Sequence, residues 1–169
     1  MVGSVHRGRK LVPVLFCVSL VAWAVASCSD SSSSDSGTSG TTPTATIFVQ
    51  NFKYNGVPAN VSSGITEFLF QNHESFPITH EMIPIALPAG KTAQDVIDAA
   101  KADGAASEDD WLHIGGDFGA VDTGAGIVEI LNLPPGTYAF ACWQTGTQSG
   151  GEDGPPHAAK GMVTSFTVS

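Results

Sequence analysis

Positive charge is scarce in this sequence. The 169 residues include only 7 Lys and Arg, against 16 Asp and Glu. Three of the basic residues lie within residues 1–10 and every acidic residue lies beyond residue 28, so the chain after residue 28 keeps four lysines and has a net charge of −12. Such a surface repels nucleic-acid phosphates and anionic lipid headgroups, and no basic cluster offsets it. We therefore expect no nucleic-acid binding.

The sequence also lacks an apolar run of the full length that a membrane-spanning helix needs. Residues 11–27 carry no charge but number only 17, whereas a membrane-spanning helix needs about 20 apolar residues. With the basic residues before it, this run is typical of a secretory signal. Its end, Val25-Ala26-Ser27-Cys28, resembles the bacterial lipobox, in which the cysteine is acylated. The alternatives are an uncleaved anchor and an ordinary signal with a chance cysteine.

These features predict the organisation of the chain. Residues 1–27 are expected to be a lipoprotein signal peptide, and Cys28 the lipidated first residue of the mature protein. Residues 28–44 are rich in Ser, contain no large apolar residue and are expected to form a flexible linker. Residues 45–169 suffice for one compact domain. We expect an extracytoplasmic monomer attached to the cell membrane only through its lipid.

Alternating apolar and polar residues predict that the domain is mostly β-strand. The expected strands, rich in β-branched and aromatic residues, are residues 45–52, 65–71, 80–87, 126–133, 137–143 and 162–169. One segment differs: residues 92–103 have apolar residues at helical spacing, Thr92 as N-cap and Gly104 as a stop. This pattern predicts an all-β fold, an antiparallel Greek-key β-sandwich with one inserted helix.

Cysteine is as scarce as positive charge. Of three cysteines, Cys17 lies in the signal and Cys28 in the lipobox, so Cys142 is the only thiol expected in the mature domain. It has no intramolecular disulfide partner, which leaves burial as a small hydrophobe, an intermolecular bond, or a metal. The period of two places Cys142 on the same strand face as Tyr138 and Phe140.

The C-terminal quarter resembles the copper-loop region of the cupredoxins, the blue-copper proteins. The segments that carry the resemblance are LPPGTYAFAC at 133–142 and HAAKGMV at 157–163, and upstream FLFQN at 68–72 followed by His80-Glu81. The resemblance implies a cupredoxin-like fold and one type 1 copper ion bound by His80, Cys142, His157 and Met162. The chain departs from the family in one respect: 14 residues separate Cys142 from His157, where small cupredoxins have only a few.

The residue types support the same chemistry. Two imidazoles, a thiolate and a weak axial thioether form the blue-copper ligand set. His73 and His113 remain alternatives to His80 as the upstream ligand.

Two classes of function follow. The first is a membrane-tethered, copper-binding cupredoxin that transfers one electron or handles copper, with a redox protein or a copper donor or acceptor as partner. The alternative is a metal-free cupredoxin-like module that presents residues 143–156 or the inserted helix to a partner. No catalytic constellation is recognisable, so we do not expect an enzyme.

Overall fold

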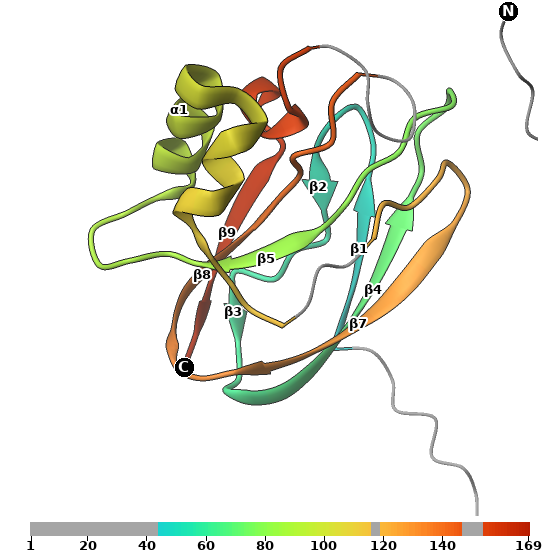
Figure 1. The fold of residues 1–169 in the computed structure, drawn as a ribbon. Coiled ribbons are helices and arrows are strands. Elements are labelled where there is room, and N and C mark those ends of the chain that lie inside the picture. Colours follow the sequence, from blue (N-terminus) through green and yellow to red (C-terminus); the bar gives the residue numbers. More distant parts are fainter. Residues whose placement is uncertain (1–43, 116–118, 147–153) are drawn as a thin grey trace, which may run out of the picture. The chain divides into compact units, whose positions relative to one another are not determined.

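The computed structural model describes residues 44–115, 119–146 and 154–169 (Figure 1). The expected signal peptide, Cys28 and the linker as far as residue 43 lie outside the described residues. One sheet has the order β2 (Tyr54–Asn55), β1 (Ala45–Val49), β4 (Gly64–Asn72), β7 (Gly126–Leu133). The other has the order β3 (Asn60–Val61), β9 (Val163–Val168), β8 (Gly136–Ala141), β5 (Ile83–Ala86), β6 (Leu112–His113).

The predicted β-sandwich with one inserted α-helix is confirmed, and both sheets are mixed. β1 pairs with β4 in parallel and β3 pairs with β9 in parallel, whereas all other pairs are antiparallel. The parallel pairs arise because the chain leaves the first sheet after β2, adds β3 to the edge of the second sheet, and then returns as β4 beside β1.

The core between the sheets follows from the alternation along each strand. Phe68 of β4 meets Phe140 of β8 edge to face at 5.3 Å between ring centroids, and Phe140 stacks on Phe166 at 4.9 Å. Tyr138, Phe140 and Cys142 all lie in this inter-sheet core, as the period of two predicts. The intervening small residues of β8 therefore face the opposite side of their sheet.

A second core lies on that opposite side, beneath the helix α1 (Ala93–Asp103). Ala139 and Ala141 of β8 leave room there for Val96 and Ala100 of the helix. The helix begins with a capping box, in which Thr92 and Asp95 bond each other's backbone N–H groups. The helix predicted for residues 92–103 is thus confirmed.

Two 3₁₀ segments adjoin α1. They are η1 (Gly104–Asp110), which continues directly from the helix, and η2 (His157–Lys160), which packs against it (Figure 1). Ala158 of η2 shares the second core with the helix. The inserted helix therefore supports the segment that carries His157. No helix in the described part of the chain is long and apolar enough to cross a membrane.

Candidate metal centre

Three of the four predicted ligands converge in the structure. His80 precedes β5 and is fixed by a two-way backbone bridge to Val121. Cys142 directly follows β8, and His157 is the first residue of η2. All three residues are 0% exposed. Their ligand atoms lie within 4.8 Å of one another.

The three atoms form a compact triangle. His80 Nδ1 lies 3.0 Å from His157 Nδ1, and Cys142 Sγ lies 3.4 Å from His157 Nδ1 and 3.8 Å from His80 Nδ1. The centre of the circle through three points so spaced is about 2.0 Å from each, which is the length of a bond between a first-row metal ion and an imidazole nitrogen. A single ion therefore fits within reach of all three.

The other nitrogen of each imidazole already has a partner. His80 Nε2 lies 3.3 Å from Glu74 Oε1, and His157 Nε2 lies 2.9 Å from the carbonyl oxygen of Gly146. Both partners only accept hydrogen bonds, so each ring places its proton on Nε2 and leaves the Nδ1 lone pair toward the cluster. This is the arrangement that orients metal-binding histidines in proteins.

Burial also sets the protonation of the cluster. It lowers the pKa of His80 to about 4, with the neighbouring His157 adding to the effect, and burial likewise lowers the pKa of His157. Both rings are therefore neutral at pH 7. Burial, and next the charge of Glu81, raise the pKa of the Cys142 thiol. A metal cation supplies the positive charge that stabilises the thiolate in such a place.

Backbone bonds hold the two C-terminal ligands together despite the 14 residues between them. Ala158 N donates to Cys142 O at 2.7 Å, and His157 N donates to Gln144 O at 2.9 Å. An isolated β-bridge joins Thr145 to Pro156. The loop is therefore closed at its base, next to the cluster; its residues 147–153 lie outside the described part of the chain.

Glu81 connects the upstream ligand to the cysteine segment. Its backbone N–H points to Cys142 Sγ at 3.5 Å, and its buried carboxylate accepts from Trp143 N at 2.7 Å and from Gln144 Nε2 at 2.9 Å. These bonds tie the residue after His80 to the two residues after Cys142. The two ligands are thereby kept at a fixed separation.

Met162, the fourth predicted ligand, is completely buried in the same core cluster as Cys142. Its backbone N–H donates to His157 O at 3.0 Å, across a turn in which Gly161 has a φ of 96°. Only glycine adopts that conformation without strain. The turn therefore keeps the methionine and His157 on adjoining parts of one short segment.

An aromatic side chain covers the imidazoles. The Phe52 ring meets His80 edge to face at 5.4 Å and His157 at 4.9 Å between ring centroids. Lys160 Nζ lies 4.7 Å from the centroid of the Phe52 ring. Sequence reasoning missed Phe52, Glu74 and Glu81, since only the resemblance near His80 pointed to this region.

The two alternative histidines lie elsewhere. His73 is exposed and stacks on Phe48 at 5.1 Å. His113 stacks on Trp143 at 6.2 Å, and its Nε2 lies 3.7 Å from Glu108 Oε1. Neither belongs to the cluster that could hold a metal ion.

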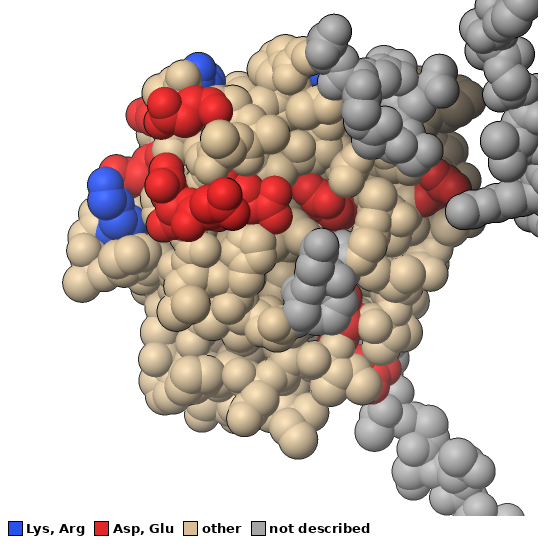
Figure 2. All heavy atoms as spheres, viewed as in Figure 1, with Lys and Arg blue, Asp and Glu red and all other residues tan. Residues whose placement is uncertain are grey.

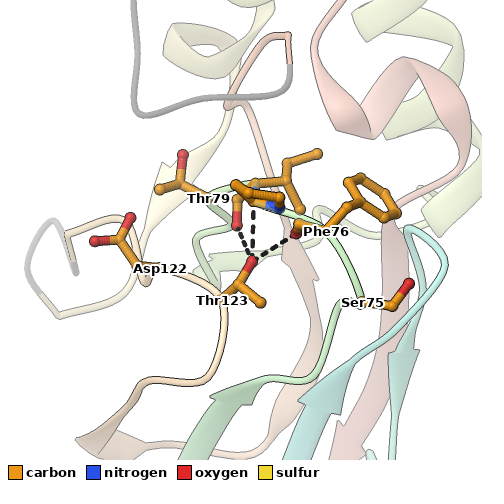
Figure 3. Close-up of a pocket in the computed structure, with 7 residues that line it drawn as sticks. Ser75, Phe76, Thr79, Asp122 and Thr123 are labelled. Carbon is orange, nitrogen blue, oxygen red and sulfur yellow. Dashed lines mark hydrogen bonds between the residues drawn. The ribbon is translucent and has the colours of Figure 1, made fainter.

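A hollow of about 580 Å³ lies along the segment that leads into His80 (Figure 3). The Thr123 hydroxyl lies in its lining, where it donates to Phe76 O at 2.8 Å and accepts from Ile78 N at 3.1 Å. Its lining comprises Ser75, Phe76, Pro77, Ile78, Thr79, Asp122 and Thr123. The lining contains no imidazole or thiol, so this hollow is separate from the metal cluster. The hydrogen bonds of Thr123 nevertheless fix the backbone of the segment that precedes His80.

Acidic side chains gather on the side of the molecule formed by α1 and η1 (Figure 2). Four exposed members are Asp98, Asp103, Asp109 and Asp110. Lys91, which precedes the helix, pairs with Asp95, and Lys101 within the helix pairs with Asp98. Other acidic side chains in that view lie scattered, apart from this group.

No family model and no curated protein matches the chain. Solved structures with similar folds include a dithionite-reduced auracyanin from Roseiflexus castenholzii, with 19% identity over 73% of this chain and 94% of that one, and a TM-score of 0.48. An auracyanin B has 16% identity over 76% and 91%, with a TM-score of 0.44. An azurin from Methylomonas sp. strain J has 13% identity over 73% and 93%, with a TM-score of 0.40. The assignment of the site rests on the geometry of this chain.

Proposed function

We propose that this protein is a copper-binding electron carrier whose type 1 site is formed by His80, Cys142, His157 and Met162. The observation that carries the proposal is the convergence of two imidazole nitrogens and one thiol sulfur, fully buried and within 4.8 Å of one another. Two imidazoles and a cysteine with a methionine nearby are the donor set that accommodates both Cu(I) and Cu(II).

Copper in such a site supplies reversible one-electron oxidation and reduction. The role of the protein is to hold the ligands in fixed positions. Each imidazole is anchored at Nε2, and backbone bonds join the cysteine segment to η2. Ligands that are fixed in advance move little when the charge of the metal changes, which favours rapid electron exchange.

The burial of the cluster favours electron transfer over copper delivery. Passing copper to another protein requires that incoming ligands reach the ion, but His80, Cys142 and His157 are each 0% exposed. Phe52 lies over both imidazoles. An electron can cross such a covering, whereas a copper ion needs it to open.

The proposal extends to the setting of the protein. The lipobox supports attachment of Cys28 to lipid, and the Ser-rich residues 29–44 support a domain held outside the cell membrane as a monomer on a flexible tether. A net charge of −12 after residue 28 favours a redox partner with a basic docking surface, because opposite charges speed the encounter.

Copper binding by a variant that lacks the lipidated cysteine tests the proposed function. Residues 28–169 with Cys28→Ser should bind one copper per chain and develop an intense visible thiolate-to-copper absorption. Cys142→Ser should remove the absorption, since the thiolate is its source. The matched control is His113→Ala, which changes a histidine outside the cluster and should leave copper and colour unchanged. Protein with a titratable reduced thiol but neither copper nor colour would refute the proposal and favour the metal-free binding module.

A further inference from the structure

Glu74 is a buried acidic residue that the ligand set does not include. It lies in the turn after β4, and its side chain is only 1% exposed. Its backbone N–H donates to Asn72 Oδ1 at 3.1 Å. The Asn72 amide in turn donates to the carbonyl oxygens of Ile78 and Val121, each at 2.8 Å. The Glu74 backbone is therefore fixed to the segments on either side of the His80 bridge.

Three donors converge on the Glu74 carboxylate. Asn51 N donates to Oε2 at 3.0 Å, Phe52 N donates to Oε1 at 2.9 Å, and His80 Nε2 lies 3.3 Å from Oε1. Because both oxygens act as acceptors, the carboxylate form satisfies all three contacts. One buried negative charge thus contacts both a ligand imidazole and the backbone of its aromatic cover.

The backbone at Asn51 and Phe52 needs such an anchor. Both residues are left-handed, with φ values of 54° and 57°. This conformation is uncommon for residues other than glycine and strained for a bulky one. Successive N–H groups held in this way form a concavity that binds an anion. Glu74 supplies that anion from within the chain and so stabilises the turn.

The anchored turn places Phe52 over the cluster. Its ring contacts both imidazoles edge to face, and Lys160 lies against the same ring. Without the carboxylate, the strained turn would lose the acceptor for both of its N–H groups. The cover would then be free to relax away from the histidines.

We propose that Glu74 is a positioning residue of the metal centre, which orients the His80 ring, holds the Phe52 cover closed and favours Cu(II) over Cu(I) by its buried charge. This inference rests on the proposed copper site. A carboxylate on the remote nitrogen of a ligand imidazole makes the ring a stronger donor, and a nearby negative charge stabilises the more positive oxidation state. The charge and the cover are separable, because one resides in Glu74 and the other in Phe52.

Three variants of the Cys28→Ser protein separate the two effects. Glu74→Gln keeps an acceptor oxygen but removes the charge, and it should keep the visible absorption while raising the midpoint potential. We expect the preference for Cu(I) to rise at least tenfold, which corresponds to 59 mV for a one-electron couple. Phe52→Leu keeps the charge, so it should leave the potential near the wild-type value but release copper to a Cu(I) chelator at least tenfold faster. Glu74→Ala should show both effects.

The matched control is Glu67→Gln, which removes a carboxylate from β4, the strand that precedes Glu74, at a half-buried position outside the cluster. It should leave the potential and the release rate unchanged. Equal potentials for Glu74→Gln and Glu67→Gln would overturn the charge effect, and wild-type release by both Phe52→Leu and Glu74→Ala would overturn the cover.

A metal-free measurement keeps this test independent of the proposed function. In the apo protein, nitrogen NMR should show His80 protonated at Nε2 alone, and Glu74→Ala should mix the two tautomers while His157 keeps its own. A His80 tautomer that is unchanged in folded Glu74→Ala overturns the positioning role. If the wild type binds no copper, the proposed function fails, and the NMR result still decides whether Glu74 orients the ring.

Discussion

Glu129 is a carboxylic acid placed in the core between the sheets. It lies opposite Phe68 in the register of β4 and β7, is 0% exposed, and neither side-chain oxygen has a hydrogen-bond partner among the described residues. Burial raises its pKa from 4.5 to about 8. The folded protein therefore keeps this group protonated at neutral pH, where the unfolded chain has released the proton.

The sign of the effect follows from this difference in bound protons. The contribution of Glu129 is most favourable below the unfolded pKa of 4.5 and is lost as the pH rises toward 8. Each pH unit in that interval lowers the free energy of unfolding by about 1.4 kcal/mol. From pH 6.5 to pH 8 the apo protein should therefore lose about 1.6 kcal/mol relative to Glu129→Gln, which cannot ionise.

The difference between the two proteins cancels the contributions of the other shifted groups. His80 and His157 have lowered pKa values, so their stabilising contribution is lost as the pH falls through 6.5, and it is the same in the wild type and in Glu129→Gln. The raised pKa of the Cys142 thiol affects the free energy of unfolding only near pH 9.0 and above. Urea unfolding of the apo protein, followed by tryptophan fluorescence at pH 6.5, 7, 7.5 and 8, measures the slope. Glu67→Gln should keep the wild-type slope; a slope in Glu129→Gln equal to that of the wild type would refute the reasoning.

Four further substitutions test separate features. Gly56→Ala should lower the free energy of unfolding by about 2 kcal/mol or more in urea, because φ is +82° and the new methyl group would meet the Thr46 carbonyl oxygen. Thr92→Ala should cost about 1 kcal/mol in the same assay through the lost helix cap. Met162→Leu should keep copper and colour but shift the midpoint potential in voltammetry, because an axial thioether tunes the metal more than it holds it. Cys28→Ser should leave the membrane fraction or accumulate unprocessed on cell fractionation, and unchanged retention with normal cleavage would contradict this.

Local patterns were enough to predict most elements, and the resemblance to the cupredoxins supplied the ligands in the C-terminal part of the site. The alternation through Tyr138 and Phe140 placed Cys142 at the end of an inward-facing stripe, and the short η2 turn holds His157 and Met162 within six residues of chain. These features depend on neighbours in sequence. That the four residues bind copper stays a prediction, as do the domain boundaries and the lipid anchor.

The rest of the site depends on contacts between distant segments. His80 differs from His73 and His113 through its bridge to Val121, which no local pattern specifies. Glu74 reaches back 22 residues to Phe52, so neither residue carried a signal in its own segment. Glu129 differs from Glu74 because the alternation of β7 already directs its side chain into the core. An acidic residue at an inward-facing strand position indicates a buried carboxyl group without any long-range contact.

The mixed pairing of the sheets has a consequence for how the protein acquires its metal. β1 reaches across to β4 and β3 to β9, so much of the sandwich depends on contacts between residues far apart in sequence, a topology that folds slowly. His80 precedes β5 and Cys142 follows β8, which pair in one sheet, but His80 is also held by its bridge to Val121, which precedes β7 of the other sheet. Before the sheets dock, His80 lacks this bridge, so the imidazole and the thiol are not yet held at their final separation. Tight copper uptake should therefore follow the slowest docking step, and the rate at which colour appears in refolding protein would time the completion of the fold.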